Sequence, residues 1–393
     1  MSARRGATTG DRSSRKAHPS KLPLSRARTQ AASSKRSWWL DHLNYIGRKY
    51  SLLEFLEDGI TSFVDRNATR LFDVFAGTGT VGWHFKRLGY TVTANDIQYY
   101  AYCLNRAFVG LNRPPAFTRL REVMGLGSAR RGPAEVLEAV NAIRSRRGFI
   151  FKNYCPGGSS TPKRFYFSDR NGQRCDGIRT QLEAWRDEGV LTEGEYYYLL
   201  ASLIVAMDRV ANTASVYAAY LKRLKSTARK DFVLNSVPVS AGTGRHPVHH
   251  RNGSELVSRI PCDILYMDPP YNQRQYCTNY HVLETIAAYD RPRLSGVTGL
   301  RPYDEQRSDF CVKGKALGAL NTMVGRARAR YVFLSYNSEG LMSRREILGV
   351  LGSYGKADVK TKRYPRFRAD ADGANRNYKA DSVTEYLFRL NKE

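Results

Sequence analysis

The sequence is poor in acidic residues and in cysteine, and it has no long apolar run. Lys and Arg number 63 against 36 Asp and Glu, so the formal net charge is +27. An excess this large favours a polyanionic partner such as nucleic acid over a merely solubilising surface. Six cysteines without C-x-x-C or zinc-ligand spacing predict reduced, mostly structural thiols and no metal site. Without an apolar run of bilayer length, we expect a soluble protein with no membrane role.

Residues 1–37 carry many Lys and Arg but a single acid, Asp11. Such a composition predicts a disordered basic tail. The tail either makes salt-dependent contacts with phosphates or is solvated and has no binding function, and the sequence does not decide between the two. It lacks the apolar core of a secretory signal, so we expect the protein to stay in the compartment where it is made, although its Ser/Arg-rich composition also suits a transit peptide.

A βαβ unit follows. Residues 70–75 read as a strand, 76–80 as a tight glycine loop, 81–88 as a helix and 91–94 as a second strand that ends beside Asp96. Gly77 and Gly79 let the backbone approach a ligand, and Asp96 is placed to accept hydrogen bonds from two ribose hydroxyls. A helix-capping role for Asp96 is the alternative. The whole unit predicts a nucleoside-bearing cofactor.

The identity of that cofactor follows from what the loop lacks. It has neither G-x-x-x-x-G-K-[ST] nor the third glycine of a dinucleotide fingerprint. S-adenosylmethionine brings no phosphate and fits better than ATP or NAD, with Asp73 at the strand end facing its ammonium group. Asn252 or Ser254, in the loop before a later strand, is placed to border the adenosine ring, and turn chemistry explains that loop equally well.

The strongest chemical signal is Asp268-Pro269-Pro270-Tyr271, at the end of the apolar strand 262–267. Pro270 biases Pro269 toward an extended conformation, which holds the Pro269 carbonyl beside the Asp268 carboxylate. These two fixed acceptors can both accept hydrogen bonds from one exocyclic amino group. Tyr271 adds a flat face on which a base stacks, worth about 1–3 kcal/mol. The alternative to a binding function is that these residues only form the turn that ends the strand.

Between these two units, residues 116–248 show no alternation of strands and helices. Helices are expected at 176–185 and 192–210, the second with Thr192 and Glu195 at capping-box spacing. A dense basic run follows at 222–230, for which we favour phosphate contact over simple surface solvation. The candidate DNA-contacting residues in this region and beside the Asp268 turn are Arg164, Lys222, Arg223, Lys225, Arg229, Lys230, Arg274 and Gln275.

Towards the C-terminus, 331–335 reads as a buried strand, Ser343 and Glu346 as a helix cap, and 359–368 with 382–390 as an antiparallel pair. The predicted fold class is α/β, a Rossmann-like sheet with an inserted, mainly helical domain. We expect a basic tail at 1–37, a cofactor-binding half at 38–115, the insertion at 116–248 and a catalytic half at 249–393.

Taken together, these motifs resemble the class alpha adenine-N6 DNA methyltransferases of bacterial type II restriction–modification systems. The resemblance rests on the segment 44–49 (NYIGRK), the loop 73–79 (DVFAGTG), Asp96 and the 268–271 turn, in that family's linear order. One departure is Arg48, where a small residue is expected.

The resemblance implies that the sheet is that of an S-adenosylmethionine-dependent methyltransferase and that the insertion is its target-recognition domain. It also implies residue roles. It implies that Tyr45 and Lys49 border the methionine end of the cofactor and that Asp96 binds its ribose. Asp268, Pro269, Pro270 and Tyr271 are implied to hold the target base. The remaining residues expected in the cofactor pocket are Asp73, Phe75, Gly77, Thr78, Gly79, Ile97 and Asn252.

The implied activity is transfer of a methyl group from S-adenosylmethionine to N6 of an adenine flipped out of duplex DNA, with S-adenosylhomocysteine as product and no metal. Cytosine-N4 methylation, RNA amino-methylation and a non-catalytic DNA-binding protein are the alternatives. The expected partners are double-stranded DNA and a restriction endonuclease acting separately. We expect a monomer or weak dimer in the bacterial cytoplasm, associated with the nucleoid.

Overall fold

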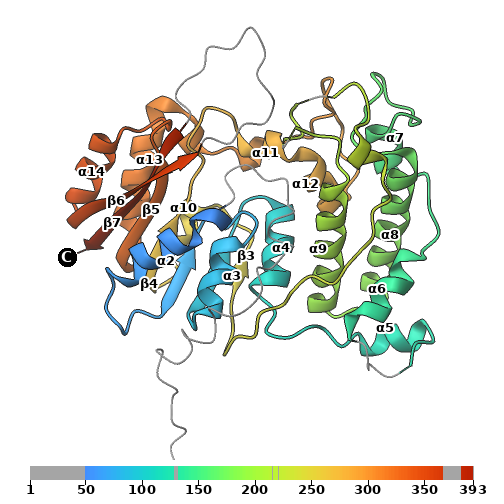
Figure 1. The fold of residues 1–393 in the computed structure, drawn as a ribbon, viewed down its shortest axis with the longest axis horizontal. Helices are drawn as coiled ribbons and strands as arrows, with labels where there is room; N and C mark the ends of the chain where they lie inside the picture. The colour runs from blue at the N-terminus through green and yellow to red at the C-terminus, as the bar shows by residue number, and fades with distance from the viewer. Residues whose placement is uncertain (1–48, 128–131, 215, 220, 366–381, 393) are drawn as a thin grey trace, which may run out of the picture.

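The computed structural model describes residues 49–127, 132–214, 216–219, 221–365 and 382–392. The predicted basic tail 1–37 and Tyr45 lie outside these residues. Within them, one seven-stranded sheet has the order β3-β2-β1-β4-β5-β7-β6 (Figure 1). The strands are β1 (Arg70–Asp73), β2 (Thr91–Asn95), β3 (Val248–His249), β4 (Cys262–Met267), β5 (Ala329–Asn337), β6 (Gly355–Pro365) and β7 (Ser382–Lys392).

Helices cover both faces of this sheet. The longer helices of the described residues, including those of the insertion, are α2 (Leu53–Thr61), α3 (Thr80–Arg87), α4 (Tyr99–Phe108), α6 (Pro133–Asn141), α8 (Asp169–Asp187), α9 (Glu193–Arg209), α12 (His281–Ala288), α13 (Lys313–Arg326) and α14 (Arg344–Gly352). The short ones are η2 (Tyr50–Leu52), α5 (Thr118–Val123), α7 (Phe149–Tyr154), η3 (Ser226–Arg229), α10 (Gly253–Leu256), α11 (Tyr276–Asn279), η4 (Asp304–Gln306) and η5 (Asp309–Cys311).

Strand β4 shows why two helical layers form. Its residues point alternately to opposite faces, as the period of a strand requires. Ile264 and Tyr266 join the core under α2 and α3, while Leu265 and Met267 join the core under α10, α13 and α14. A strand that is apolar on both faces is typical of a parallel sheet buried between helices, and β4 pairs in parallel with both β1 and β5.

The C-terminal strands reverse the direction of the sheet. β7 runs antiparallel to β5 and β6, so the start of β7 lies at the edge where β4 and β5 end. In this register Glu385 of β7 is opposite Asn337, the last residue of β5. The predicted antiparallel pair is confirmed over the residues that the structure describes, while 366–368 of its first strand lie outside them.

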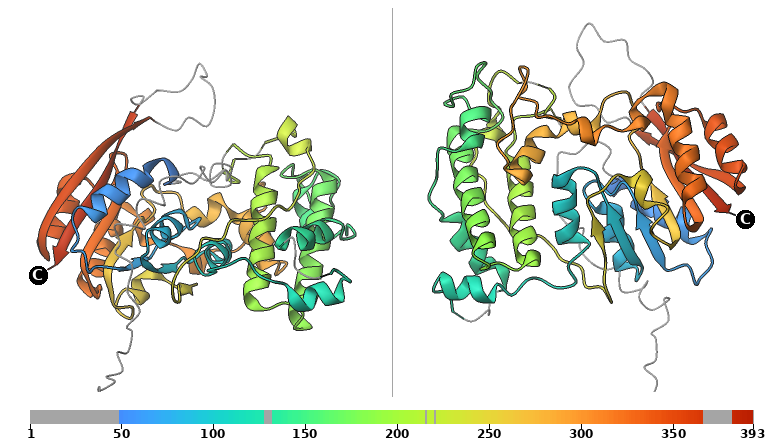
Figure 2. Two further views of the ribbon diagram at one scale, coloured as in Figure 1. Left: turned by 60° about the horizontal axis from the view of Figure 1, so that its bottom comes forward. Right: turned by 180° about the vertical axis from the view of Figure 1, so that it is seen from behind.

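The insertion builds a separate helical core beside the sheet. α8 and α9 pack there with α4 and α12, in a cluster of buried residues that includes Leu104, Leu203 and Ile286. Thr192 and Glu195 form the predicted capping box of α9, and Ser343 and Glu346 form that of α14. Figure 2 shows, from two further sides, the sheet at one end of the molecule and these helices at the other. Among the described residues, no helix combines the length and apolar character that crossing a membrane requires.

Candidate active site

The order of the strands reverses between β1 and β4, because β2 and β3 lie outward of β1 while β5 lies outward of β4. In open α/β sheets, ligands bind in the crevice that opens at the carboxyl ends of the strands at such a point. Asp73 ends β1 and Asp268 directly follows β4. A cavity of about 600 Å³ opens there, and both acids line it.

One end of the cavity is formed by the glycine loop. Gly77 and Gly79 have φ angles of 51° and 79°, in the left-handed region that favours glycine. The Gly77 N–H donates to Asp96 Oδ2 at 2.8 Å, and the Gln98 N–H donates to Asp96 Oδ1 at 2.9 Å. Burial raises the pKa of Asp96 to about 6 despite these donors. Asp96 is therefore a half-buried carboxylate that faces the cavity with lone pairs still open to hydroxyl donors.

Asp73 is a buried acid without a cationic partner among the described residues, although the backbone N–H groups of Gly82 and Phe75 favour its ionised form. Its side chain is buried, and within the described residues neither carboxylate oxygen makes a hydrogen bond of normal geometry. Burial raises its pKa well above the ordinary value, and the charges of Asp268 and Asp96 raise it further. A cationic ligand in the cavity would compensate this carboxylate, which fits a cofactor that carries ammonium and sulfonium groups.

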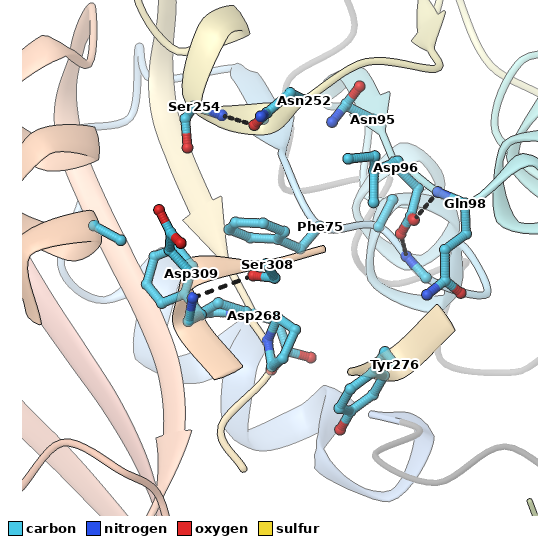
Figure 3. A pocket seen from close by; sticks show the side chains of 18 of the residues that line it. Phe75, Asn95, Asp96, Gln98, Asn252, Ser254, Asp268, Tyr276, Ser308 and Asp309 are labelled. Atoms are coloured by element: carbon cyan, nitrogen blue, oxygen red, sulfur yellow. Dashed lines mark hydrogen bonds between the residues drawn. The ribbon is translucent and has the colours of Figure 1, made fainter. Parts of the chain in front are cut away.

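The middle of the cavity is apolar with a polar rim. Figure 3 shows Phe75 between the turn that carries Asn252 and Ser254 and the loop that carries Ser308 and Asp309. Asn252 Oδ1 accepts from the Ser254 N–H at 3.0 Å, so this asparagine caps α10 and also lines the cavity. The position is compatible with both readings of the sequence, a turn residue and a neighbour of an adenine ring.

The other end of the cavity carries the 268–271 turn. The cavity is lined by all four residues of the turn, and the ring of Tyr271 packs edge-on against that of Tyr336. Lys49 Nζ lies 3.0 Å from Asp268 Oδ1, with little of either side chain exposed. Burial raises the pKa of Asp268, while the neighbouring ammonium opposes that rise. The resemblance implied that Lys49 borders the cofactor, and the structure shows that it also contacts the residue expected to hold the target base.

Two side chains hold segments around the cavity to one another. The Gln275 carboxamide exchanges two hydrogen bonds with the backbone of Ser308, at 2.8 and 3.1 Å. Glu284, which is buried on α12, accepts from the N–H groups of Tyr99 and Tyr100 at 2.9 Å each. A carboxylate is stabilised at a helix N-terminus, so Glu284 ties α12 to the first turn of α4.

The predicted cofactor residues are mostly brought together. Lys49, Asp73, Phe75, Gly77, Thr78, Asp96, Ile97 and Asn252 line the cavity. Gly79 instead lies behind the loop as the N-cap of α3, where an added Cβ would come 2.8 Å from Asn105 Oδ1. Its conformation shapes the loop without forming the cavity wall.

One predicted DNA contact is wrong. Arg164 is buried, and its guanidinium donates to the carbonyl oxygens of Val297, Asn153 and Gly296. A guanidinium with its donors engaged inside the protein is not available to a phosphate. Arg164 instead ties the insertion to the loop 296–299.

The remaining basic candidates keep a surface position. Lys222, Arg223, Arg229, Lys230 and Arg274 are exposed, and Lys225 is exposed too although its Nζ donates to the Thr213 carbonyl oxygen at 2.7 Å. The segment that carries the 222–230 run is attached to α11 through the Tyr217 N–H, which donates to the Asn279 carbonyl oxygen at 2.8 Å. Contact of these residues and of Gln275 with DNA stays a prediction.

Sequence reasoning missed Glu284 and Glu385. Glu284 lies on α12, and only its position against α4 reveals its role. Glu385 lies on β7 without a motif around it, and its position beside Lys49 and Asp268 depends on the reversal of the sheet. No spacing along the chain signals either contact.

Comparisons with known proteins agree with this geometry. Residues 45–348 match the family model described as D12 class N6 adenine-specific DNA methyltransferase. The chain is 41% identical over 352 residues to type II methyltransferase M.NlaIII of Neisseria lactamica, covering 89% of this chain and 99% of that protein. It is 35% identical over 351 residues to type II methyltransferase M.FokI of Planomicrobium okeanokoites, and 32% identical over 354 residues to modification methylase StsI of Streptococcus sanguinis. These two matches each cover 89% of this chain but only 53% and 52% of the relatives, so the chain spans about half their length.

Proposed function

The chain belongs to the D12 class N6 adenine-specific DNA methyltransferases, and we propose that one cavity holds both its cofactor and its target base. Its activity is sequence-specific methylation of adenine at N6 in DNA. The family model and these relatives give no support to cytosine-N4 methylation. The observation that carries the proposal is the continuity of the cavity from Asp96 to Tyr271.

S-adenosylmethionine fits the Asp73 and Asp96 end. Asp96 would accept from the ribose hydroxyls, and the buried Asp73 would face the cationic part of the molecule. Asn252 and Ile97 would border the adenine ring. The cofactor supplies an electrophilic methyl group on a sulfonium. Everything else in the reaction is positioning and electrostatics supplied by the chain.

The target adenine fits the Asp268 end. N6 of a paired and stacked base is out of reach of any side chain, so the base must leave the duplex. In the cavity, the Asp268 carboxylate and the Pro269 carbonyl would accept from the two N6 hydrogens, which localises the nitrogen lone pair that resonance otherwise draws into the ring. Tyr271 would stack on the base. No cysteine nucleophile is required.

DNA binding is proposed for the exposed cations around the cavity mouth. Arg274 follows the 268–271 turn by three residues. Tyr217, which precedes the 222–230 run, is hydrogen-bonded to α11, whose Tyr276 lines the cavity. We assign target recognition to residues 116–248 and the catalytic α/β domain to 38–115 and 249–393, with α4 and α12 of the latter contributing buried residues to the core of the insertion. Because the relatives are named type II methyltransferases or modification methylases, a restriction endonuclease that reads the same sequence is the expected counterpart.

One experiment tests base, atom and sequence together. The full chain is expressed in a host without DNA methylation, and modified bases are mapped by single-molecule sequencing. N6-methyladenine at one short recurrent sequence is the expected result. Modified cytosine, or methylation without any sequence preference, would contradict the proposal. The mapped sequence then supplies the duplex for every assay below.

A further inference from the structure

Three segments far apart in the chain place charged groups around one point at the base-binding end of the cavity. Lys49 precedes η2, Asp268 follows β4, and Glu385 lies on β7. Lys49 Nζ pairs with Asp268 Oδ1 at 3.0 Å. Burial would lower the pKa of Lys49, but the charges of Asp268 and then of Glu385 raise it above its ordinary value. The ammonium is therefore charged and lies within the field of two carboxylates.

Glu385 is only partly satisfied in this arrangement. It is buried, and the Asn337 side chain donates a hydrogen bond to its carboxylate. The Asn337 carbonyl oxygen Oδ1 already accepts from the Glu339 N–H at 3.1 Å, which turns the asparagine amide N–H group toward Glu385. Glu385 Oε2 is buried without a hydrogen-bond partner among the residues that the structure describes. A buried acceptor left open costs free energy, so this oxygen marks a place for a donor.

Lys49 Nζ is bound at Oδ1 of Asp268, the carboxylate that is proposed to accept from the target amino group. An ammonium is a stronger donor to a carboxylate than a neutral amine is, so a flipped adenine competes with Lys49 at a disadvantage. The competition becomes balanced if the ammonium has a second carboxylate to bind. Glu385 is the carboxylate in that position, and it does not line the cavity itself.

We propose that Lys49 holds Asp268 in the absence of DNA and passes to Glu385 when N6 of the target adenine takes its place. The inference rests on the proposed function, since it assumes that Asp268 receives the target amino group. Without DNA, Lys49 then occupies the place of the base at Asp268. Glu385 is a positioning residue that acts through Lys49. The exchange keeps the buried ammonium of Lys49 paired with a carboxylate before and after the base enters, which a low-dielectric site favours.

The exchange also selects for an amino group at position 6. Only a base with N–H donors at that position compensates Asp268 for the loss of the ammonium. A purine without the 6-amino group leaves Asp268 paired with Lys49 and so enters the cavity less readily. Removing the acceptor at Glu385 should weaken this preference, because Lys49 then has no alternative partner.

The test measures the affinity of the full-length protein for a duplex that carries adenine or unsubstituted purine at the target position. S-adenosylhomocysteine is present so that no transfer occurs. The wild type should prefer adenine, and Glu385→Gln should reduce that preference by about tenfold, the size expected for one charge-assisted hydrogen bond. In a Lys49→Gln background, Glu385→Gln should change the preference by less than about twofold, because the group through which it acts is missing.

Two variants separate this role from a structural one. Glu385→Asp keeps the charge and should restore most of the preference if Glu385→Gln folds poorly. Asp358→Asn removes a carboxylate from the same hairpin, where it pairs with Arg389 outside the cavity, and should leave the preference unchanged. Equal effects of Glu385→Gln in both backgrounds, or no effect in either, would overturn the inference. If the wild type itself neither methylates adenine nor prefers it over purine, the proposed function fails instead.

Discussion

Replacing Asp268 with alanine should separate chemistry from cofactor binding. The change removes the carboxylate that accepts from N6 in a buried site. Loss of one preorganised hydrogen-bonding group of this kind typically costs a factor of about 10²–10³ in rate, or about 2.7–4 kcal/mol. We expect the loss in single-turnover methyl transfer to be at the upper end of that range, because the same carboxylate also orients the amino group.

Stability should fall as well. Asp268→Ala leaves the buried ammonium of Lys49 without its partner at 3.0 Å. Breaking a buried ion pair by removing one member costs about 3–5 kcal/mol, and the nearby Glu385 carboxylate should hold the loss near about 3 kcal/mol. Urea unfolding of the free protein measures this change.

The affinity for S-adenosylmethionine should stay within about threefold of the wild type, a difference below about 1 kcal/mol, because Asp96 and Asp73 are untouched. Isothermal titration measures that affinity, and transfer of a labelled methyl group to the mapped duplex measures the chemistry. The matched control is Asp263→Ala, on the same strand, which breaks a 2.7 Å pair with Arg70 outside the cavity. It should lower stability while leaving transfer intact. Transfer by Asp268→Ala within tenfold of the wild type would refute the assignment.

Three further predictions address the cofactor, the DNA and the insertion. Burial raises the pKa of Asp96 to about 6. Affinity for S-adenosylmethionine should therefore fall as the pH is lowered through about 6, because the carboxylate that accepts from the ribose becomes protonated. Titrations at several pH values should show that this fall in affinity is absent in Asp96→Asn. The pair Lys222→Ala and Arg229→Ala should lower the slope of log affinity against log salt by about 2, and an unchanged slope would remove both from the DNA surface. Arg164→Ala should cost about 3 kcal/mol in the free energy of unfolding without changing that slope, because its donors serve three backbone carbonyls.

Ionisation of Asp96 should also change the stability of the protein without cofactor. A carboxyl group whose pKa is higher in the folded state than in the unfolded chain binds its proton more tightly when folded. Its contribution to stability is fully present below about pH 4 and is lost as the pH rises to about 6. Bound cofactor should reverse this trend if the ribose hydroxyls prefer the ionised form. A pH series of unfolding curves with and without cofactor checks both directions.

Much of the site was predictable because its parts are local. The strand, glycine loop, helix, strand and acid of the βαβ unit follow one another within a short stretch, and each has its own sequence signal. The 268–271 turn is likewise a continuous segment at the end of a strand whose apolar run is legible in the sequence. Since parallel strands end at the same edge of a sheet, two such units are expected to face one crevice. The cavity that joins Asp96 to Asp268 bears this out.

Arg164 shows where local reasoning fails. A cation beside aromatic residues is typical of nucleic-acid contact, but it equally suits a buried guanidinium that satisfies loop carbonyls. The choice between the two depends on where the loop 296–299 lies, and that loop is far away in the sequence. Burial is a property of the packed molecule, so no pattern of neighbours along the chain decides it.

The sequence by itself determined the α/β class, the βαβ unit for the cofactor, the 268–271 turn and the basic character that favours DNA. Each of these depends on residues that are neighbours in the chain. The tertiary structure alone decided which charges meet. Lys49, Asp268 and Glu385 come together only because β7 runs antiparallel and starts where β4 and β5 end. Contacts between distant segments are set by strand order and direction, and these are selected by the packing of the whole core.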